Sequence, residues 1–256
     1  MSGAQADRPR RPTVSVVVPV RDDAVHLRAC LALLGVQSRR VDEVVVVDNG
    51  SRDHSADVAR AAGARVVVQP VPGIPAAASA GYDAARGDLI LRCDADSRPA
   101  PDWVERICAV LESAPEVAGV TGPPRFVDRV GVQGRVREVL HTLGYRWCAG
   151  AAAASVPLWG SNFGLRAAAW RDVREQVERV DPLVHDDLDL SFCLALSGRH
   201  PVVHVPTLRM GASGRGFTAA AARRRQLRMA VATLRRNWAV LSPGQRWVRR
   251  LGRRAG

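Results

Sequence analysis

The order of apolar and polar residues divides the first hundred residues into alternating strands and helices. Four short, almost continuous apolar runs have the pattern of buried strands: residues 13–20, 43–47, 64–69 and 88–93. Helical spacing of apolar residues separates them, at residues 24–34, at 55–62 and in an Ala-rich segment that ends near Arg86. This alternation predicts an α/β fold with a mostly parallel central sheet and right-handed crossovers.

Polar clusters follow three of the four predicted strands. They are Arg21-Asp22-Asp23, the segment from Asp48 to Asp53, and Asp94-Ala95-Asp96. Ligands of such sheets bind beyond the carboxyl ends of the strands, and these ends meet at one edge. The sequence therefore predicts a functional site built from aspartates at that edge.

Two common nucleotide sites are excluded by their motifs. The loop after the first strand has no glycine, so it lacks the G-x-G-x-x-G of dinucleotide-binding domains. No G-x-x-x-x-G-K-[ST] is present, and the chain contains no lysine to complete one.

The pair Asp94 and Asp96 flanks one small residue at a strand end. Mg²⁺ or Mn²⁺ is held in many enzymes by one or two protein carboxylates, while diphosphate oxygens and water complete the shell. A D-x-D also occurs in ordinary turns, but its position after an apolar strand and before Pro99 favours a metal site.

The basic residues are distributed unevenly. The chain has 256 residues and a net charge of +12, and all 37 basic residues are arginines. From Arg199 onward there are 14 arginines and no acid, so residues 1–198 carry 23 arginines against 25 acids. The charge pattern predicts a near-neutral body followed by a basic C-terminal segment.

The composition is that of a globular protein, and the length suits one large domain or two small ones. No apolar run reaches the 18 or so residues that span a bilayer, and residues 1–12 are polar, so we expect a disordered leader rather than a secretory signal. The five scattered cysteines contain no C-x-x-C pair, and buried free thiols in a cytoplasmic protein are expected.

The segments PTVSVVVPVRDD, DEVVVVDNGSRDHS and AAASAGYDAARGDLILRCDADSRPAPDWV resemble family 2 glycosyltransferases of the GT-A fold. The similarity extends from residue 13 to about residue 207. It implies an inverting, hexosyltransferase-type enzyme that takes a sugar from a nucleoside-diphosphate sugar, with Mg²⁺ or Mn²⁺ on the diphosphate.

The resemblance also implies which residues bind the donor. The loop of Pro19, Val20, Arg21 and Asp22 and the aspartates Asp48 and Asp53 match the nucleoside site. Asp94 and Asp96 match the metal motif, with Asp96 the more direct ligand, and Asp94 with Ala95 completes the donor set. Many relatives carry Arg-Asn where this chain has Ala78-Ser79, which leaves the nucleotide base open.

A second acidic cluster opens a predicted helix that ends at Gly198. Acids in a first helical turn stabilise the helix through its dipole, and that accounts for some of them. By the resemblance, Asp187 is the general base that takes the proton from the acceptor hydroxyl. Asp186 stands where relatives have Glu, and it is expected to contact the acceptor.

The segment Trp159-Gly160-Ser161-Asn162-Phe163 resembles the acceptor-side motif of the family. Gly160 allows close approach of the backbone to a sugar, and Asn162 offers hydrogen-bond donors and an acceptor. Two interpretations of Trp159 remain open: it stacks on a sugar ring, or it covers the core.

Residues 217–238 are predicted to form a helix with an apolar stripe of Leu227, Val231, Leu234 and Trp238 beside many arginines. Three interpretations remain open. The helix packs on the domain with a solvated arginine face, lies on an anionic membrane surface, or binds nucleic acid, for which no recognition motif is present.

The sequence thus predicts a leader at residues 1–12, a GT-A-like domain at 13–210 and a basic amphipathic helical tail at 211–256. Residues 13–100 form its nucleotide-sugar half and 101–210 its acceptor half. The acceptor hydroxyl belongs to a glycan, a lipid-linked molecule or a small molecule. We expect a cytoplasmic protein at the inner face of the membrane. A sugar-1-phosphate nucleotidyltransferase, which would need a Gly-rich loop, and a non-catalytic basic adaptor are the alternatives.

Overall fold

The computed structural model describes residues 10–127, 131–212 and 220–252. Its centre is a seven-stranded sheet with the strand order β3-β2-β1-β4-β7-β5-β8. The strands in that order are β3 (Arg65–Val68), β2 (Glu43–Asp48), β1 (Val14–Val20), β4 (Leu89–Arg92), β7 (Phe163–Arg166), β5 (Gly119–Thr121) and β8 (Val202–His204). Only β7 runs antiparallel to its neighbours, so the predicted mostly parallel sheet is confirmed.

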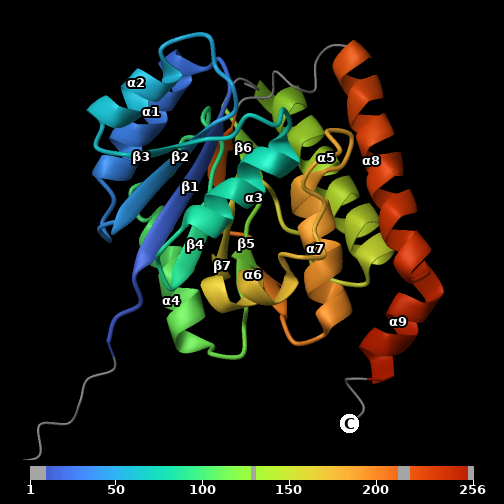
Figure 1. Cartoon of the computed structure of the whole chain (residues 1–256). Helices are drawn as coiled ribbons and strands as arrows, with labels where there is room; N and C mark the ends of the chain where they lie inside the picture. The colour runs from blue at the N-terminus through green and yellow to red at the C-terminus, as the bar shows by residue number, and fades with distance from the viewer. Residues whose placement is uncertain (1–9, 128–130, 213–219, 253–256) are drawn as a thin grey trace, which may run out of the picture.

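Helices cover both faces of the sheet (Figure 1). One face packs against α1 (Ala24–Gly35), α2 (Ser55–Ala61) and α4 (Trp103–Ser113). The other face packs against α3 (Ile74–Ala84), α6 (Ala167–Val173) and α7 (Asp186–Ser197). Burial of the strands on both faces explains why their sequences are almost continuously apolar.

The remaining elements lie beside this three-layered body. A small parallel sheet joins β6 (Pro124–Phe126) to β9 (Met210–Ala212), and α5 (Gly131–Ala153) runs along α7. Helices α8 (Ala220–Val240) and α9 (Pro243–Gly252) follow along the edge that is drawn at the right in Figure 1.

The basic tail packs on the domain, as one of the three interpretations required. Asn237 Nδ2 donates to the buried carboxylate of Asp189 at 2.6 Å, and the hydroxyl of Thr233 accepts a bond from the His185 backbone N–H at 2.8 Å. Among the α8 side chains that the structure describes, Met229, Thr233 and Asn237 are buried. Two of the three are polar, because α7 presents polar groups that need partners.

The apolar stripe predicted for this helix is therefore not its buried face. Leu227, Val231 and Trp238 remain 67, 38 and 37 % exposed. Leu234 packs against the helices below, and the Trp238 indole donates to the Ala152 carbonyl of α5 at 3.3 Å. The chain before Ala220 and the Ala220 side chain lie outside the described residues.

Helix α9 fastens the end of the tail. The Trp247 indole donates to the backbone carbonyl of Ala151 in α5 at 2.9 Å. The buried Arg246 guanidinium donates to three backbone carbonyls, among them that of Asn237 at 2.8 Å, and lies over the Phe192 ring at 4.6 Å.

At both predicted domain boundaries, residues on the two sides of the boundary take part in contacts with the rest of the domain. The boundary at residue 210 falls inside β9, which pairs with β6. Most of the predicted leader lies outside the described residues, but Arg10 forms an ion pair with Asp88, and Pro12 accepts a hydrogen bond from Arg39.

The cysteines are all free. Four are buried as predicted, but Cys148 is exposed, so the prediction is wrong for this residue. It lies on the long helix α5, one side of which has no neighbour to cover it. Within the described part of the chain, no helix is long and apolar enough to cross a membrane.

Candidate active site

A cleft of about 910 Å³ opens at the carboxyl ends of β1 and β4. The chain segments after these strands line one side of it, and α5, α7 and α8 line the other. Its charged side chains include Arg21, Asp94, Asp96, Asp186 and Asp187. The two acidic clusters that lie about ninety residues apart in the sequence therefore face one space.

Asp94 and Asp96 are held by a turn at the end of β4. The Asp94 backbone N–H donates to the Ser97 hydroxyl at 2.9 Å, and the Ser97 backbone N–H donates to the Asp94 carbonyl at 3.0 Å. Burial raises the pKa of the Asp94 carboxyl to about 6, although the nearby Arg92 guanidinium opposes this shift. The turn interpretation and the ligand interpretation are compatible, because the turn uses backbone atoms and a serine rather than the carboxylates.

These carboxylates fit a hard divalent cation that shares its ligands with a substrate. Both line the cleft, and carboxylate oxygens are the ligands that Mg²⁺ and Mn²⁺ prefer. Among the described residues no group of three or more His, Cys, Asp or Glu side chains could hold a metal ion. A cation here would therefore need oxygen ligands from a bound diphosphate or from water.

Arg92 is a buried cation beneath the cleft that the sequence reasoning did not single out. Its side chain forms ion pairs with Asp186 and with Asp94, the latter at 3.2 Å, and donates to the Tyr82 hydroxyl at 3.3 Å. Its Nε is buried without a hydrogen-bond partner among the described residues. An arginine inside the apolar run of β4 was a usable signal, because arginine is rarely buried unless it is paired.

The ion pair gives Asp186 a structural role beside the predicted one. Its carboxylate lines the cleft and is paired with Arg92, and its contact with the acceptor remains a prediction. A buried ion pair keeps both charges only when each compensates the other. Asp186 thus orients the buried arginine beside Asp94.

Asp187 occupies the first turn of α7 and faces the cleft. Its Oδ2 accepts from the Gly160 backbone N–H and its Oδ1 from the Leu188 N–H, both at 2.8 Å. Burial raises the pKa of the Asp187 carboxyl, and the negative charge of Asp186 raises it further. A fixed carboxylate with a raised pKa suits a group that has to accept a proton.

Gly160 lines the cleft and packs closely against this aspartate. A Cβ at residue 160 would lie 3.1 Å from Asp187 Oδ2 and 3.4 Å from Arg92 Nη1. The missing side chain therefore makes room for Asp187 and Arg92, and the approach of a sugar to the Gly160 backbone remains a prediction.

Asn162 is wrongly predicted as an acceptor ligand. Its side chain is fully buried, its Oδ1 accepts from the Trp103 indole at 2.8 Å, and its Nδ2 donates to the Leu208 carbonyl at 2.7 Å. Its hydrogen-bonding groups are thus used inside the protein, where an unpaired amide would be costly.

Trp159 lines the cleft and is partly exposed, with its ring at 83° to that of Tyr145 and 4.9 Å between centroids. The edge contact with Tyr145 fixes the orientation of the indole. Stacking on a sugar thus remains a prediction.

The predicted donor residues separate into two groups. Pro19, Val20, Arg21 and Ala95 line the cleft together with Asp94. Asp22 does not line it; it has a φ of 51°, and its carboxylate accepts from the Arg52 backbone N–H in the loop after β2.

Asp48 and Asp53 also lie outside the lining of the cleft. Asp48 Oδ1 accepts from the Ser51 N–H at 2.9 Å, and Asp53 binds Ser55 and the first N–H of α1, at Ala24. Asp53 thus joins the starts of α1 and α2. The nucleoside role of these residues remains a prediction.

Helices α5 and α8 supply a side of the cleft that the sequence did not reveal. Its side chains are mostly apolar or small: Tyr145, Cys148, Ala149, Ala152, Leu227, Met229, Ala230 and Leu234. Arg225 and Gln226 also reach it. The sequence signal was present only as amphipathic patterning, which does not say what a helix faces.

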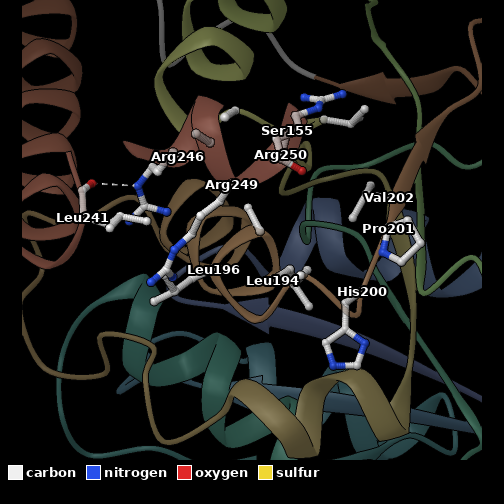
Figure 2. Close-up of a pocket in the computed structure, with 15 residues that line it drawn as sticks. Ser155, Leu194, Leu196, His200, Pro201, Val202, Leu241, Arg246, Arg249 and Arg250 are labelled. Carbon is white, nitrogen blue, oxygen red and sulfur yellow. Dashed lines mark hydrogen bonds between the residues drawn. The ribbon is translucent and has the colours of Figure 1, made fainter. Parts of the chain in front are cut away.

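A second cavity, of about 300 Å³, lies between α7, β8 and α9 (Figure 2). Leu194, Leu196 and His200 line it together with the arginines of α9. Among the residues that the structure describes, no carboxylate lines this cavity, and none of the predicted site residues reaches it. The first cleft is therefore the candidate active site.

Two family models match the chain. The model of glycosyl transferase family 2 matches residues 15–155, and that of glycosyl transferase family group 2 matches residues 89–254. The first contains the strand-end aspartates after β1, β2 and β4, and the second contains Asp187 and α8.

Curated relatives match only part of the chain. The undecaprenyl-phosphate 4-deoxy-4-formamido-L-arabinose transferase of Pseudomonas fluorescens is 34 % identical over 116 residues, which are 41 % of this chain and 34 % of the relative. The protein of the same description from Serratia proteamaculans is 32 % identical over 116 residues, or 41 and 36 % of the two chains. The chain thus spans about a third of these relatives.

Solved structures match nearly the whole fold. Glucosyl-3-phosphoglycerate synthase from Mycobacterium tuberculosis, in complex with Mn²⁺, UDP-glucose and phosphoglyceric acid, superposes with a TM-score of 0.66 at 22 % identity. The match covers 88 % of this chain and 80 % of that chain. At this identity the likeness shows the fold, and it confirms the predicted GT-A-like architecture.

Proposed function

The chain belongs to glycosyl transferase family 2, and from this membership we propose that it transfers a sugar from a nucleoside-diphosphate sugar to an acceptor hydroxyl with inversion. One observation carries the proposal: the strand-end aspartates Asp94 and Asp96 and the helix-start aspartate Asp187 line the same cleft. Inverting transfer needs these two functions side by side, a site for the leaving diphosphate and a base for the acceptor. Family membership also favours this reaction over nucleotidyl transfer.

In the proposed mechanism, Asp187 receives the proton of the acceptor hydroxyl while that oxygen attacks the anomeric carbon. The Gly160 and Leu188 N–H groups hold the carboxylate in place. Asp94 and Asp96 would hold Mg²⁺ or Mn²⁺, and such a cation supplies charge stabilisation to the departing diphosphate. Arg21, in the same cleft, lies on the donor side as a further cation.

We predict that nucleoside diphosphates stabilise the protein in the presence of Mn²⁺. A ligand that binds only the folded state adds RT ln(1 + [L]/Kd), about 2.7 kcal/mol at a concentration one hundred times Kd. The melting temperature should therefore rise with UDP, GDP or dTDP, and the largest rise identifies the base. The UDP-glucose complex of the M. tuberculosis structure makes UDP the first choice.

The same titration with a chelator in place of Mn²⁺ is the control, and it should remove most of the shift. Should no nucleotide raise the melting temperature with Mn²⁺ present, the proposed donor site is wrong. If the nucleotide raises the melting temperature equally with Mn²⁺ and with chelator, the proposed metal site is contradicted, but the nucleotide site is not.

We propose that the basic tail and α5 place the enzyme peripherally at an anionic membrane surface. Large apolar side chains are exposed along α5, at Leu140 and Trp147, and along α8, at Leu227 and Trp238. Exposed arginines of α8 flank the latter. Exposed tryptophan with arginine is the composition of segments that lie in a membrane interface. The relatives from Pseudomonas, whose names contain undecaprenyl phosphate, agree with this location.

The membrane proposal predicts a charge-dependent association with vesicles. Each basic residue near an anionic surface contributes about 1 kcal/mol. We therefore expect the affinity for phosphatidylglycerol vesicles, measured by sedimentation, to fall about a hundredfold when glutamine replaces the exposed residues Arg224, Arg228 and Arg235.

A matched variant replaces three exposed arginines elsewhere on the body, Arg28, Arg40 and Arg171, with glutamine. It should sediment like the unchanged protein. Equal losses in both variants would show a general charge effect and would remove the proposed surface. Binding to zwitterionic vesicles should be weak for all three proteins.

A further inference from the structure

Resting on the proposed function, the geometry points to an amphiphilic acceptor: we propose that its hydroxyl-bearing head sits at Asp187 while a hydrocarbon chain lies between α5 and α8. The two sides of the cleft differ in chemistry. Charged side chains gather where β1, β4 and α7 end or begin, whereas the α5 and α8 side is built mostly from apolar and small side chains.

Helix α8 turns part of its apolar surface toward this side. It buries Thr233 and Asn237 against α7, while two residues of the predicted stripe, Leu227 and Leu234, line the cleft. Leu227 is 67 % exposed, a large apolar surface left uncovered beside a cavity. Covering such a surface is favourable by about 25 cal/mol per Å². A hydrocarbon chain is the ligand chemistry that gains from it.

Helix α5 shapes the opposing wall with small residues. Ala149 and Ala152 face the cleft at helical spacing, and the exposed thiol of Cys148 lies beside them. Small side chains fill less of the space between the two helices than larger ones would. This wall therefore presents a surface of small and apolar groups to the cleft.

The apolar walls begin next to the proposed base. The His185 ring Nε2 lies 3.4 Å from the Gln226 backbone carbonyl in α8, and the His185 N–H bonds to Thr233. Residue 185 immediately precedes the acidic pair of α7, so α8 passes directly over the catalytic end of that helix. An acceptor whose hydroxyl reaches Asp187 therefore has α8 and α5 beside the rest of the molecule.

The charges along the cleft agree with this arrangement. Arg225 of α8 lines the same cleft and is exposed, while no carboxylate of the described α5 and α8 residues does so. A head group with negative charge would meet a guanidinium here, and the chain that follows would meet Leu227 and Ala230. The α8 side of the cleft thus offers a cationic group and an apolar surface close together.

Alkylation of Cys148 tests the occupant without requiring transfer. Cys148 is the only exposed thiol of the chain, because the other four cysteines are buried. We expect dodecyl phosphate, below its micelle-forming concentration, to slow iodoacetamide alkylation of Cys148 about tenfold, measured by mass spectrometry. Butyl phosphate has the same head, and it should leave the rate unchanged.

Two variants of α8 locate the effect. Leu227→Gln should raise the dodecyl phosphate concentration needed for half-protection about tenfold, as burial of one leucine implies. Val240→Gln changes an equally exposed residue of the same helix outside the cleft and should not alter it. Equal protection by both phosphates, protection by neither, or the same response of both variants would overturn the inference.

Nucleotide binding separates this inference from the proposed function. If UDP with Mn²⁺ stabilises the protein but dodecyl phosphate protects Cys148 no better than butyl phosphate does, only the proposal of an amphiphilic acceptor is contradicted. Protection of Cys148 without stabilisation by any nucleoside diphosphate would contradict the sugar-transfer proposal but would still support a binding site for a hydrocarbon chain.

Discussion

Replacing Asp187 with asparagine is expected to lower turnover at least about a hundredfold, the lower end of what general acid–base catalysis contributes. The amide keeps the size of the side chain but cannot accept the acceptor proton. Donor binding should change little, since Asp187 contacts Gly160 and Leu188 rather than the strand-end aspartates. The effect should therefore appear in kcat rather than in the nucleotide Kd.

The pH profile adds a second readout for the same substitution. Burial raises the Asp187 pKa, and the base works only when it is deprotonated. Activity should accordingly fall with decreasing pH at a point above the value of about 3.9 for an exposed aspartate. The residual activity of Asp187→Asn should lose the contribution of Asp187 to the acid limb, whereas the contribution of Asp94, whose pKa burial raises to about 6, should remain.

Asp57→Asn is the matched control, because Asp57 also occupies the first turn of a helix, in α2, and its side chain is exposed. Both variants lose a favourable charge near a helix N-terminus, worth a few tenths to 1 kcal/mol. Near-normal turnover of folded Asp187→Asn, or an equal loss in Asp57→Asn, would show that Asp187 is not the base.

Replacing Asp96 with alanine is expected to reduce transfer at least about a hundredfold at a fixed Mn²⁺ concentration. Charge stabilisation by a bound cation amounts to several kcal/mol, and each 1.36 kcal/mol changes the rate tenfold. Only Asp94 and Asp96 offer carboxylates at the end of β4, so the loss of one leaves a weak site.

The measurement is the rate of transfer, or of slow donor hydrolysis, as a function of Mn²⁺ concentration. The curve for Asp96→Ala should shift to higher Mn²⁺, whereas Asp102→Ala, which removes an exposed acid at the start of the next helix, should follow the unchanged protein. Overlapping curves for Asp96→Ala and the unchanged protein would exclude Asp96 as a ligand. Absence of any metal-dependent turnover in the unchanged protein would support the adaptor alternative.

Much of the fold was readable from the sequence because its elements have local signatures. The apolar runs that became β1 and β4 are buried along their whole length, and most of β2 is buried, so period-two alternation is absent. The edge strand β3 is apolar as well but only half-buried. Gly63 and Gly198 end their helices with φ values of 76° and 67°, as glycine after a helical pattern predicts. The antiparallel strand β7 was not foreseen, since strand direction depends on distant partners.

The candidate site was readable only in part. The strand-end position of Asp94 and Asp96 and the helix-start position of Asp187 are properties of the sequence, and the structure brings them to one cleft. The role expected of Asn162 was wrong because local motif spacing does not show which side chains surround a residue.

What the sequence by itself determined, then, is the α/β architecture, the family and the chemistry of the strand ends, because these follow from local periodicity and short motifs. Tertiary structure decided the rest. Arg92 meets Asp186 across 94 residues, and α8 buries Thr233 and Asn237 while its apolar stripe borders the cleft. The physical reason is that a buried polar group takes whichever partner the fold brings to it, and that partner is distant along the chain.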